Sequence, residues 1–161
     1  MRKSDREVTD ISEKLAVLLR CRYFTLALQT GGAPYLVPLN FGAELRGGEL
    51  FIYFHCAKEG TKLDLLRADP AVGFSAANLL RVFNKGTAPC GYTSDYESIC
   101  GTGIARVLEK EEEREHALRV LMAHYTGEIF AETPFDARAL SFTAAAEICV
   151  REWTCKRLVR N

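Results

Sequence analysis

Residues 22–55 contain three short runs of apolar and β-favouring residues, and the segments between these runs are too short for anything but turns. The runs read RYFTLALQ, PYLVPLNFG and ELFIYFH, and they are separated by TGGA and AELRGG. Parallel strands need a crossover of about a dozen residues or more, whereas antiparallel strands can be joined by a tight turn. The sequence therefore predicts a three-stranded antiparallel meander. Pro38 cannot donate to a ladder, so the second strand is expected to lie at an edge or to be bulged.

Three other segments have helical patterns. Asp10 is suited to be the N-cap of a first helix, with Glu13 in the capping-box position. A second helix is expected after His55 and should stop before Pro70, because proline disfavours the helical conformation of the residue before it. The third pattern begins with a run of glutamates after residue 108 and ends at Gly127, a residue type favoured just beyond a helix.

The remaining segments predict further strands and one long loop. Residues 71–77, 96–109 and 144–153 are strand-like, and a basic tail follows the last of them. The two glycines within 96–109 indicate a bulge or a close backbone approach. Residues 78–91 show no clear period and are interpreted as a loop that sets substrate access. Hairpin-linked strands with peripheral helices predict a mainly β protein, an antiparallel barrel in a single domain over residues 1–161.

Charge and cysteine usage narrow the classes of function. Lys plus Arg and Asp plus Glu each total 21, so the balance does not favour a nucleic-acid partner. The charged opening MRKSDREVTD and the lack of a long apolar run predict neither a signal peptide nor a membrane span, and hence a cytoplasmic location. Six cysteines occur without a C-x-x-C pair. They are expected to be free thiols, several of them buried, and no metal site is predicted.

The segment YFHCAKEGTKLDLL, residues 53–66, places a glycine, a threonine and two lysines at a strand-to-helix corner. Backbone amides at the start of a helix lack intrahelical partners and attract anions, and Gly60 would let an anionic group approach the backbone. Glu59 disfavours this interpretation unless it points outward. The spacing is not that of a Walker A loop. An anion site and an ordinary solvated turn both remain open on these residues alone.

The other motifs are weaker. GTGIAR at residues 101–106 lacks the third glycine of a dinucleotide fingerprint, and no helix follows it. His116 and His124 lie eight residues apart on the glutamate-rich helix, where a surface or helix-packing role is favoured over metal ligation. His55 ends a strand beside the corner, so it either meets a ligand or is satisfied by backbone. The chain has no G-x-S-x-G elbow that would indicate a hydrolase.

Five segments together carry a family resemblance. They are PYLVPLNFG (34–42), YFHCAKEGTKLDLL (53–66), YTSDYESICGTGIA (92–105), LMAHYTG (121–127) and WTCK (153–156), in that order. With these motifs the chain resembles the pyridoxamine 5′-phosphate oxidase-like FMN-binding split-barrel family, and specifically its nitroimidazole-resistance (Nim-type) branch. The resemblance implies a split β-barrel and a homodimer with FMN in two equivalent grooves between the subunits.

The resemblance also implies which residues form the site. The implied cofactor-binding residues are Val37, Pro38, Asn40, His55, Lys58, Gly60, Thr61, Lys62, Tyr92, Ser98, Trp153 and Lys156, and His55 is also the candidate catalytic residue. The VPLN strand would contact the isoalloxazine ring, the corner would hold the phosphate, and the last four residues would reach in from the partner subunit. Cys56 and Cys155 depart from the family pattern, and either thiol could narrow the groove.

The implied function is that of an FMN-dependent oxidoreductase, nitroreductase-like, which passes electrons to a small-molecule acceptor such as a 5-nitroimidazole. The flavin would supply the chemistry, so few side chains would be needed for it. The alternative is a non-catalytic flavin- or haem-binding protein of the same fold, with a histidine as the axial ligand. Pyridoxamine 5′-phosphate oxidation itself is less favoured, because the chain lacks that enzyme's basic substrate-binding pattern near the C-terminus.

Overall fold

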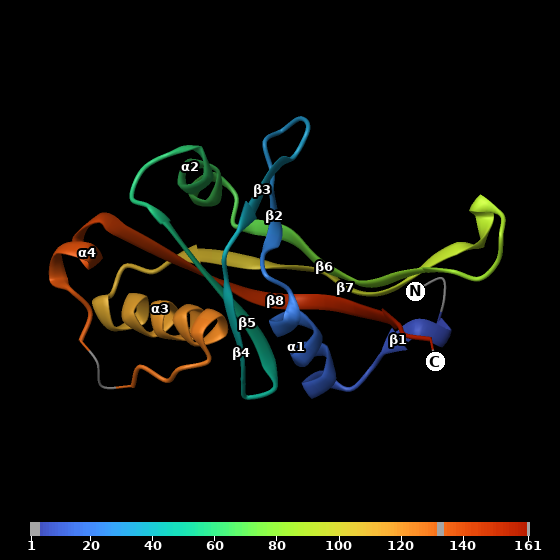
Figure 1. The fold of residues 1–161 in the computed structure, drawn as a ribbon. Coiled ribbons are helices and arrows are strands. Elements are labelled where there is room, and N and C mark those ends of the chain that lie inside the picture. Colours follow the sequence, from blue (N-terminus) through green and yellow to red (C-terminus); the bar gives the residue numbers. More distant parts are fainter. Residues whose placement is uncertain (1–3, 132–133, 161) are drawn as a thin grey trace.

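The computed structural model describes residues 4–131 and 134–160 (Figure 1). The helices are α1 (Ile11–Arg20), α2 (Thr61–Ala68), α3 (Glu111–Thr126) and α4 (Ala137–Phe142), with 3-10 turns at Ser4–Arg6 and Pro89–Gly91. The strands are β1 (Glu7–Val8), β2 (Phe24–Leu28), β3 (Tyr35–Leu39), β4 (Gly42–Arg46), β5 (Glu49–Ala57), β6 (Ala71–Asn84), β7 (Tyr92–Val107) and β8 (Thr143–Leu158). The first three residues of the charged N-terminal stretch and the last residue of the basic tail lie outside the described ranges.

All these strands belong to one antiparallel sheet, in the order β3-β2-β6-β7-β8-β5-β4, with β1 paired to β8. The antiparallel sheet with peripheral helices is confirmed, but the predicted closed barrel is not, because no ladder joins β3 to β4 among the described strands. The two end strands are nevertheless consecutive in the chain and are separated only by Asn40 and Phe41. The chain itself therefore connects the two edges of the open sheet.

The sheet curls around a core of aromatic and aliphatic side chains. Phe24 on β2 is fully buried, and its ring centroid lies 5.3 Å from that of Phe41, 6.2 Å from that of Phe54 and 6.5 Å from that of Phe74. Phe74 belongs to β6, which pairs with β2, whereas Phe54 belongs to β5 near the other end of the strand order. Two of the three contacts are edge-to-face, an arrangement that aromatic quadrupoles favour. One shared core thus holds β2 and β5 facing each other although no ladder joins them.

The predicted meander over residues 22–55 is wrong in its pairing. β2 and β3 form the expected hairpin, and Pro38 lies on an edge strand as predicted. The AELRGG segment, however, is not only a turn between two strands. Its first four residues complete β4, which pairs with β5 through a two-residue turn at Gly47 and Gly48. Their φ angles of 60° and 88° suit the left-handed conformations that a tight hairpin turn needs.

The predicted loop over residues 78–91 is also wrong. β6 continues to Asn84 and β7 starts at Tyr92, so the first half of this segment is paired strand and the second half is the turn of a long hairpin that extends away from the body of the molecule (Figure 1). A register shift between Leu79 and Arg81 interrupts the alternation of side chains, which explains why the sequence shows no period there. The last strand also runs further than predicted, and takes in most of the basic tail.

Several local predictions are confirmed. Asp10 caps α1 by accepting a 2.8 Å hydrogen bond from the Glu13 amide. The C-cap of α2 is Asp69, directly before Pro70, and Gly127 ends α3 with a φ of 73°. β7 is irregular at its glycines, because the register shifts between Thr102 and Gly103. None of the helices in the described ranges is long and apolar enough to cross a membrane.

Hydrogen bonds from the C-terminal end of α3 connect the β3–β4 junction to the end of α1. The imidazole of His124 lies with Nδ1 2.6 Å from the Phe41 carbonyl oxygen and Nε2 2.9 Å from that of Leu19. The Tyr125 hydroxyl donates to the Arg22 carbonyl at 2.5 Å and accepts from the Phe41 amide at 3.2 Å. Of the surface and packing roles that the sequence allowed, His124 has the packing role, and the strand that contains the VPLN motif is anchored at its end.

Candidate functional site

The strand-to-helix corner after β5 has the backbone of an anion site. Gly60 precedes α2 with a φ of 127° and a ψ of 165°, and a side chain there would meet no atom within 4 Å. Its carbonyl accepts from the amides of Leu63 at 2.9 Å and Asp64 at 3.2 Å, so the helix starts cleanly at this residue. No side chain in the described part of the chain caps α2. Its first amides are thus left to water or to a ligand.

A cavity of about 220 Å³ opens at this corner. Gly60, Thr61 and Lys62 line it, together with the half-buried Cys56 and with Tyr35 from the start of β3. The Lys62 ammonium lies 5.7 Å from the centroid of the Phe54 ring, which places this charge over the edge of the core. Glu59 also lines the cavity, but it is exposed, so water screens its charge. The corner therefore offers amides, a hydroxyl and an ammonium group within one hollow.

His55 lies one residue before Cys56 and pairs with Ala145 of β8. His55 is exposed at this strand end, but partial desolvation still lowers its pKa, and the positive charge of Lys62 lowers the pKa further. The imidazole is consequently neutral at neutral pH, with one nitrogen that donates and one that accepts a hydrogen bond. An anion that neutralises Lys62 would remove part of this effect.

This coupling gives a first prediction. In Lys62→Ala, we expect the pKa of His55 to rise toward its ordinary value, because the smaller of the two causes of its depression is gone. Because the folded protein binds fewer protons at His55 than the unfolded chain just below pH 6.5, stability contributed by this residue falls as the pH drops through that window. An NMR titration of the histidine ring signals measures the pKa of His55 in the unaltered protein and in Lys62→Ala. The His55→Asn variant identifies which signal belongs to His55. An unchanged His55 titration would contradict the coupling.

The other predicted site residues lie elsewhere in the single chain. Val37 is half-buried on β3, whereas Pro38 and Asn40 are exposed there or just beyond. Ser98 and Lys156 are directly paired neighbours on β7 and β8. None of these five lines the corner cavity.

Tyr92 and Trp153 are also separate from the corner. Tyr92 starts β7 at the far end of the long hairpin and is 63% exposed. Trp153 lines a different hollow, of about 260 Å³, and the Lys14 ammonium lies 4.9 Å from its ring centroid. Of the two cysteines that depart from the family pattern, only Cys56 borders the corner cavity, since Cys155 is fully buried. The expectation that Cys155 narrows a groove is therefore wrong.

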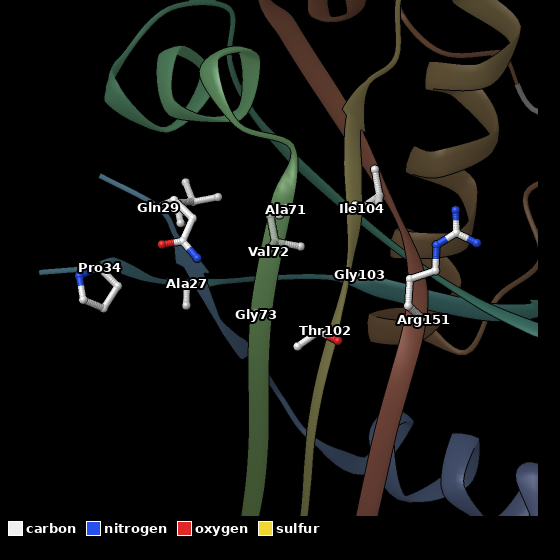
Figure 2. Close-up of a pocket in the computed structure, with 11 residues that line it drawn as sticks. Ala27, Gln29, Pro34, Ala71, Val72, Gly73, Thr102, Gly103, Ile104 and Arg151 are labelled. Atoms are coloured by element: carbon white, nitrogen blue, oxygen red, sulfur yellow. The ribbon is translucent and has the colours of Figure 1, made fainter. Parts of the chain in front are cut away.

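Another hollow contains none of the predicted site residues. It has a volume of about 410 Å³ and lies across β2, β6, β7 and β8. Figure 2 shows Ala27, Gln29 and Pro34 on one side of it and Arg151 on the other, with Gly73 and Thr102 between them. It and the corner cavity border the same stretch of chain, since Pro34 lines one and Tyr35 the other. We take the corner as the chemically better defined site, because its charged and backbone groups converge.

A comparison with protein-family models matches residues 10–157 to the family described as pyridoxamine 5′-phosphate oxidase. The chain belongs to this pyridoxamine 5′-phosphate oxidase family. The resemblance carried by the five motifs is thereby confirmed at the level of the family. No curated protein matches the sequence.

Solved structures share the fold of this family member. A candidate 5-nitroimidazole antibiotic resistance protein from Bacteroides thetaiotaomicron has a TM-score of 0.77 and 24% identity, over 94% of this chain and 86% of its own. A flavocytochrome from Azotobacter vinelandii has a TM-score of 0.77 and 19% identity, over 99% and 72%. An FAD- and haem-binding protein from Mycobacterium smegmatis has a TM-score of 0.77 and 21% identity, over 94% and 73%. At these identities the likeness is one of fold.

The structure adds residues to the site that sequence reasoning missed. Tyr35 reaches the corner from β3, and no local pattern connects it to α2. Lys58, predicted to hold a phosphate at the corner, lines a neighbouring cavity instead, together with Arg67 and Arg114. Arg67 lies four residues after Leu63, so a shared helix face could have been predicted for these two. Arg114 on α3 is too distant in sequence to give any such signal.

Proposed function

We propose that the protein is an FMN-dependent oxidoreductase that passes electrons to a small acceptor such as a 5-nitroimidazole. The observation that carries this proposal is the corner at Gly60, Thr61 and Lys62, whose open backbone, uncapped amides and ammonium group fit the terminal phosphate of a flavin nucleotide. Membership of the pyridoxamine 5′-phosphate oxidase family supports it. The names of the structural neighbours, which include flavin-binding proteins and a candidate nitroimidazole-resistance protein, support it further.

Each residue at the corner has a role in this proposal. Lys62 provides charge and Thr61 a hydroxyl to the phosphate, and Gly60 keeps the approach to the backbone free. When bound, the flavin would supply the electron-transfer chemistry. His55, neutral at neutral pH, would orient the ligand through a hydrogen bond and would be able to pass a proton to it. Val37, Pro38 and Asn40 would position the ring system along the edge strand β3.

The proposal includes a homodimer in the cytoplasm. Large apolar side chains stay exposed along β3 and the β6–β7 hairpin, with 56–68% of their surface accessible: Leu36, Leu79, Val82 and Tyr92. Exposed apolar side chains that gather on one face often mark an interaction surface, so we propose that a second copy of the chain covers those of the hairpin. In such a dimer the groove of the partner subunit would be completed by residues that do not line the corner cavity of their own chain: Tyr92, Ser98, Trp153 and Lys156.

The phosphate assignment is tested by Lys62→Ala. We expect the affinity for FMN to fall by about 10- to 100-fold, because a hydrogen bond to a charged group is worth roughly 1.5–3 kcal/mol. Titration of the apoprotein with FMN, followed by flavin fluorescence, measures the effect. Lys110→Ala is the matched control, since Lys110 is an exposed lysine that lines neither the corner cavity nor its neighbour. Equal FMN affinity in both variants would remove the basis for the proposal.

A non-catalytic haem-binding protein is the alternative, because two of the structural neighbours are a flavocytochrome and an FAD- and haem-binding protein. In this case His55, partly exposed at the end of β5, would be the axial ligand. The absorption spectrum of the purified protein separates the two candidates, since flavin bands support the first and a Soret band the second. Reduction of a 5-nitroimidazole with NADH or NADPH as donor then tests turnover.

A further inference from the structure

A second cavity lies beside the corner and is lined by basic side chains from three elements. It has a volume of about 180 Å³ and is bordered by Lys58 from the turn before α2, Arg67 from α2 and Arg114 from α3. One carboxylate, that of Glu109, also lines it. The volume is far above the roughly 10–15 Å³ that a single water molecule requires, so a polyatomic ion has room in it.

The charges in this cavity are poorly compensated by the protein. The nearest carboxylate oxygens lie 3.9 Å from Arg114, on Glu111, and 3.8 Å from Arg67, on Asp64, both near the limit of an ion pair. The Lys58 side chain makes no hydrogen bond or ion pair with any residue in the described ranges. Three positive charges thus border a hollow that one carboxylate lines. Lys58 and Arg67 are exposed, so water screens their charges, whereas Arg114 is mostly buried and is screened least.

Arg114 gives the strongest sign of a missing partner. Its side chain is only 19% exposed, and its Nε is buried without a hydrogen-bond acceptor in the described part of the chain. Its one hydrogen bond to the backbone is long, at 3.4 Å to the Glu109 carbonyl oxygen. An unsatisfied buried donor costs about 1–3 kcal/mol, and more for a charged group. An anion in the cavity would satisfy this donor, and the guanidinium fork is suited to two parallel bonds with phosphate oxygens.

The two cavities adjoin. Leu63 lines both, and the turn that contains Lys58 leads directly to Gly60. Basic residues of both cavities affect the pKa of the Cys56 thiol, which lines the corner cavity. Burial raises the pKa of Cys56, and the positive charges of Lys62 and Arg67 each counteract this rise.

We infer that Lys58, Arg67 and Arg114 form a second anion site, which takes a phosphate group in addition to the one bound at the corner. The inference rests on the proposed function, because it assumes that the corner cavity holds the phosphate of the flavin. Two sources share this chemistry. The group is either the second phosphate of a flavin dinucleotide that spans both cavities, or a phosphate of a separate ligand such as a phosphorylated electron donor.

The test uses the full chain in two arms at constant ionic strength. In the first arm, the apoprotein is titrated with FMN and with FAD. In the second, FMN-loaded protein is titrated with inorganic phosphate and binding is followed by ³¹P NMR. The variants are Arg67→Gln and Arg114→Gln, and the control is Arg138→Gln, an exposed arginine on α4 outside both cavities. Because Arg67 is 56% exposed, its variant should fold even if Arg114→Gln does not.

We expect Arg67→Gln and Arg114→Gln to weaken the binding of either FAD or inorganic phosphate about tenfold or more. The control Arg138→Gln should leave both affinities unchanged. A loss confined to FAD, with FMN unaffected, identifies the dinucleotide as the source. A loss of phosphate binding to the FMN-loaded protein identifies a separate ligand. If neither arm differs between the variants and the control, the second anion site does not exist. Lys62→Ala separates the two proposals, because reduced FMN affinity in that variant keeps the proposed function valid even when the second site fails.

Discussion

Gly42→Ala should destabilise the protein by about 3 kcal/mol, which is the upper end of the usual cost of overpacking. Gly42 begins β4 and is buried beneath α3. A β-carbon built on it would lie 2.5 Å from the Leu121 amide nitrogen and 2.6 Å from the Val120 carbonyl carbon. Both contacts are with the backbone of a helix, so no side-chain rotation can relieve them. Either α3 moves away from the sheet or β4 moves away from β5.

The matched control is Gly73→Ala. Gly73 also lies in a strand, but a β-carbon there would only contact Ala27 Cβ at 3.7 Å and the Gly101 carbonyl oxygen at 3.9 Å. Since these are ordinary contacts and alanine restricts the unfolded chain, this variant should be neutral or slightly stabilised. Urea unfolding of both variants, followed by circular dichroism, gives the two free energies. If Gly42→Ala unfolds like the control, the close packing of α3 on β4 is incorrect.

This packing matters for the candidate site because it fixes the β3–β4 junction. Phe41, which lies between the two strands, bonds through its amide and carbonyl groups with Tyr125 and His124 of α3. If α3 shifts, β3 loses its anchor at the end where Asn40 lies. Flavin affinity of Gly42→Ala, measured on the folded fraction, should therefore fall as well, although Gly42 lines none of the cavities at the corner.

Local patterns predicted those parts of the fold that depend on neighbours in sequence. The cap at Asp10, the stop before Pro70 and the C-cap at Gly127 each follow from the conformational preference of one residue, and each is present. The corner at Gly60 is of the same kind. A strand, a glycine-bearing turn and a helix are all local, so the sequence alone could predict a candidate anion site there.

Long-range pairing could not be predicted in this way. The four residues Ala43–Arg46 become a strand because they pair with β5, and their own pattern is too short to show alternation. The long β6–β7 hairpin escapes detection because the bulge at Leu80 shifts the alternation by one residue. The second cavity depends on Arg114 meeting Lys58 and Arg67 across more than forty residues of chain, and no spacing rule connects them.

The polar contacts of Glu97 on β7 also join residues that are distant in sequence, and they give the second prediction of a large change in stability. Arg20→Ala should destabilise the protein by about 3 kcal/mol, because it leaves a buried carboxylate without its main partner. Glu97 is fully buried, and the Arg20 guanidinium donates to its two oxygens at 2.9 and 2.7 Å. The Asn78 amide adds a 3.1 Å bond, whereas Arg157 lies 4.0 Å away. Arg157→Gln is therefore the control and should cost much less.

The pH dependence of this loss distinguishes a buried charge from simple loss of packing. Burial alone would raise the pKa of Glu97, but the bonds from Arg20 and Asn78 outweigh it and hold the pKa below its ordinary value of 4.5. In the native protein this contribution to stability is present above pH 4.5 and is lost as the pH falls through the lowered pKa. In Arg20→Ala the effect of burial on the pKa of Glu97 dominates, so this pKa rises. Protonation of the Glu97 carboxyl as the pH falls then removes the cost of burying its charge. The difference in unfolding free energy between the two proteins should therefore be smaller at pH 5 than at pH 7, and a constant difference would show that Arg20 acts through packing alone.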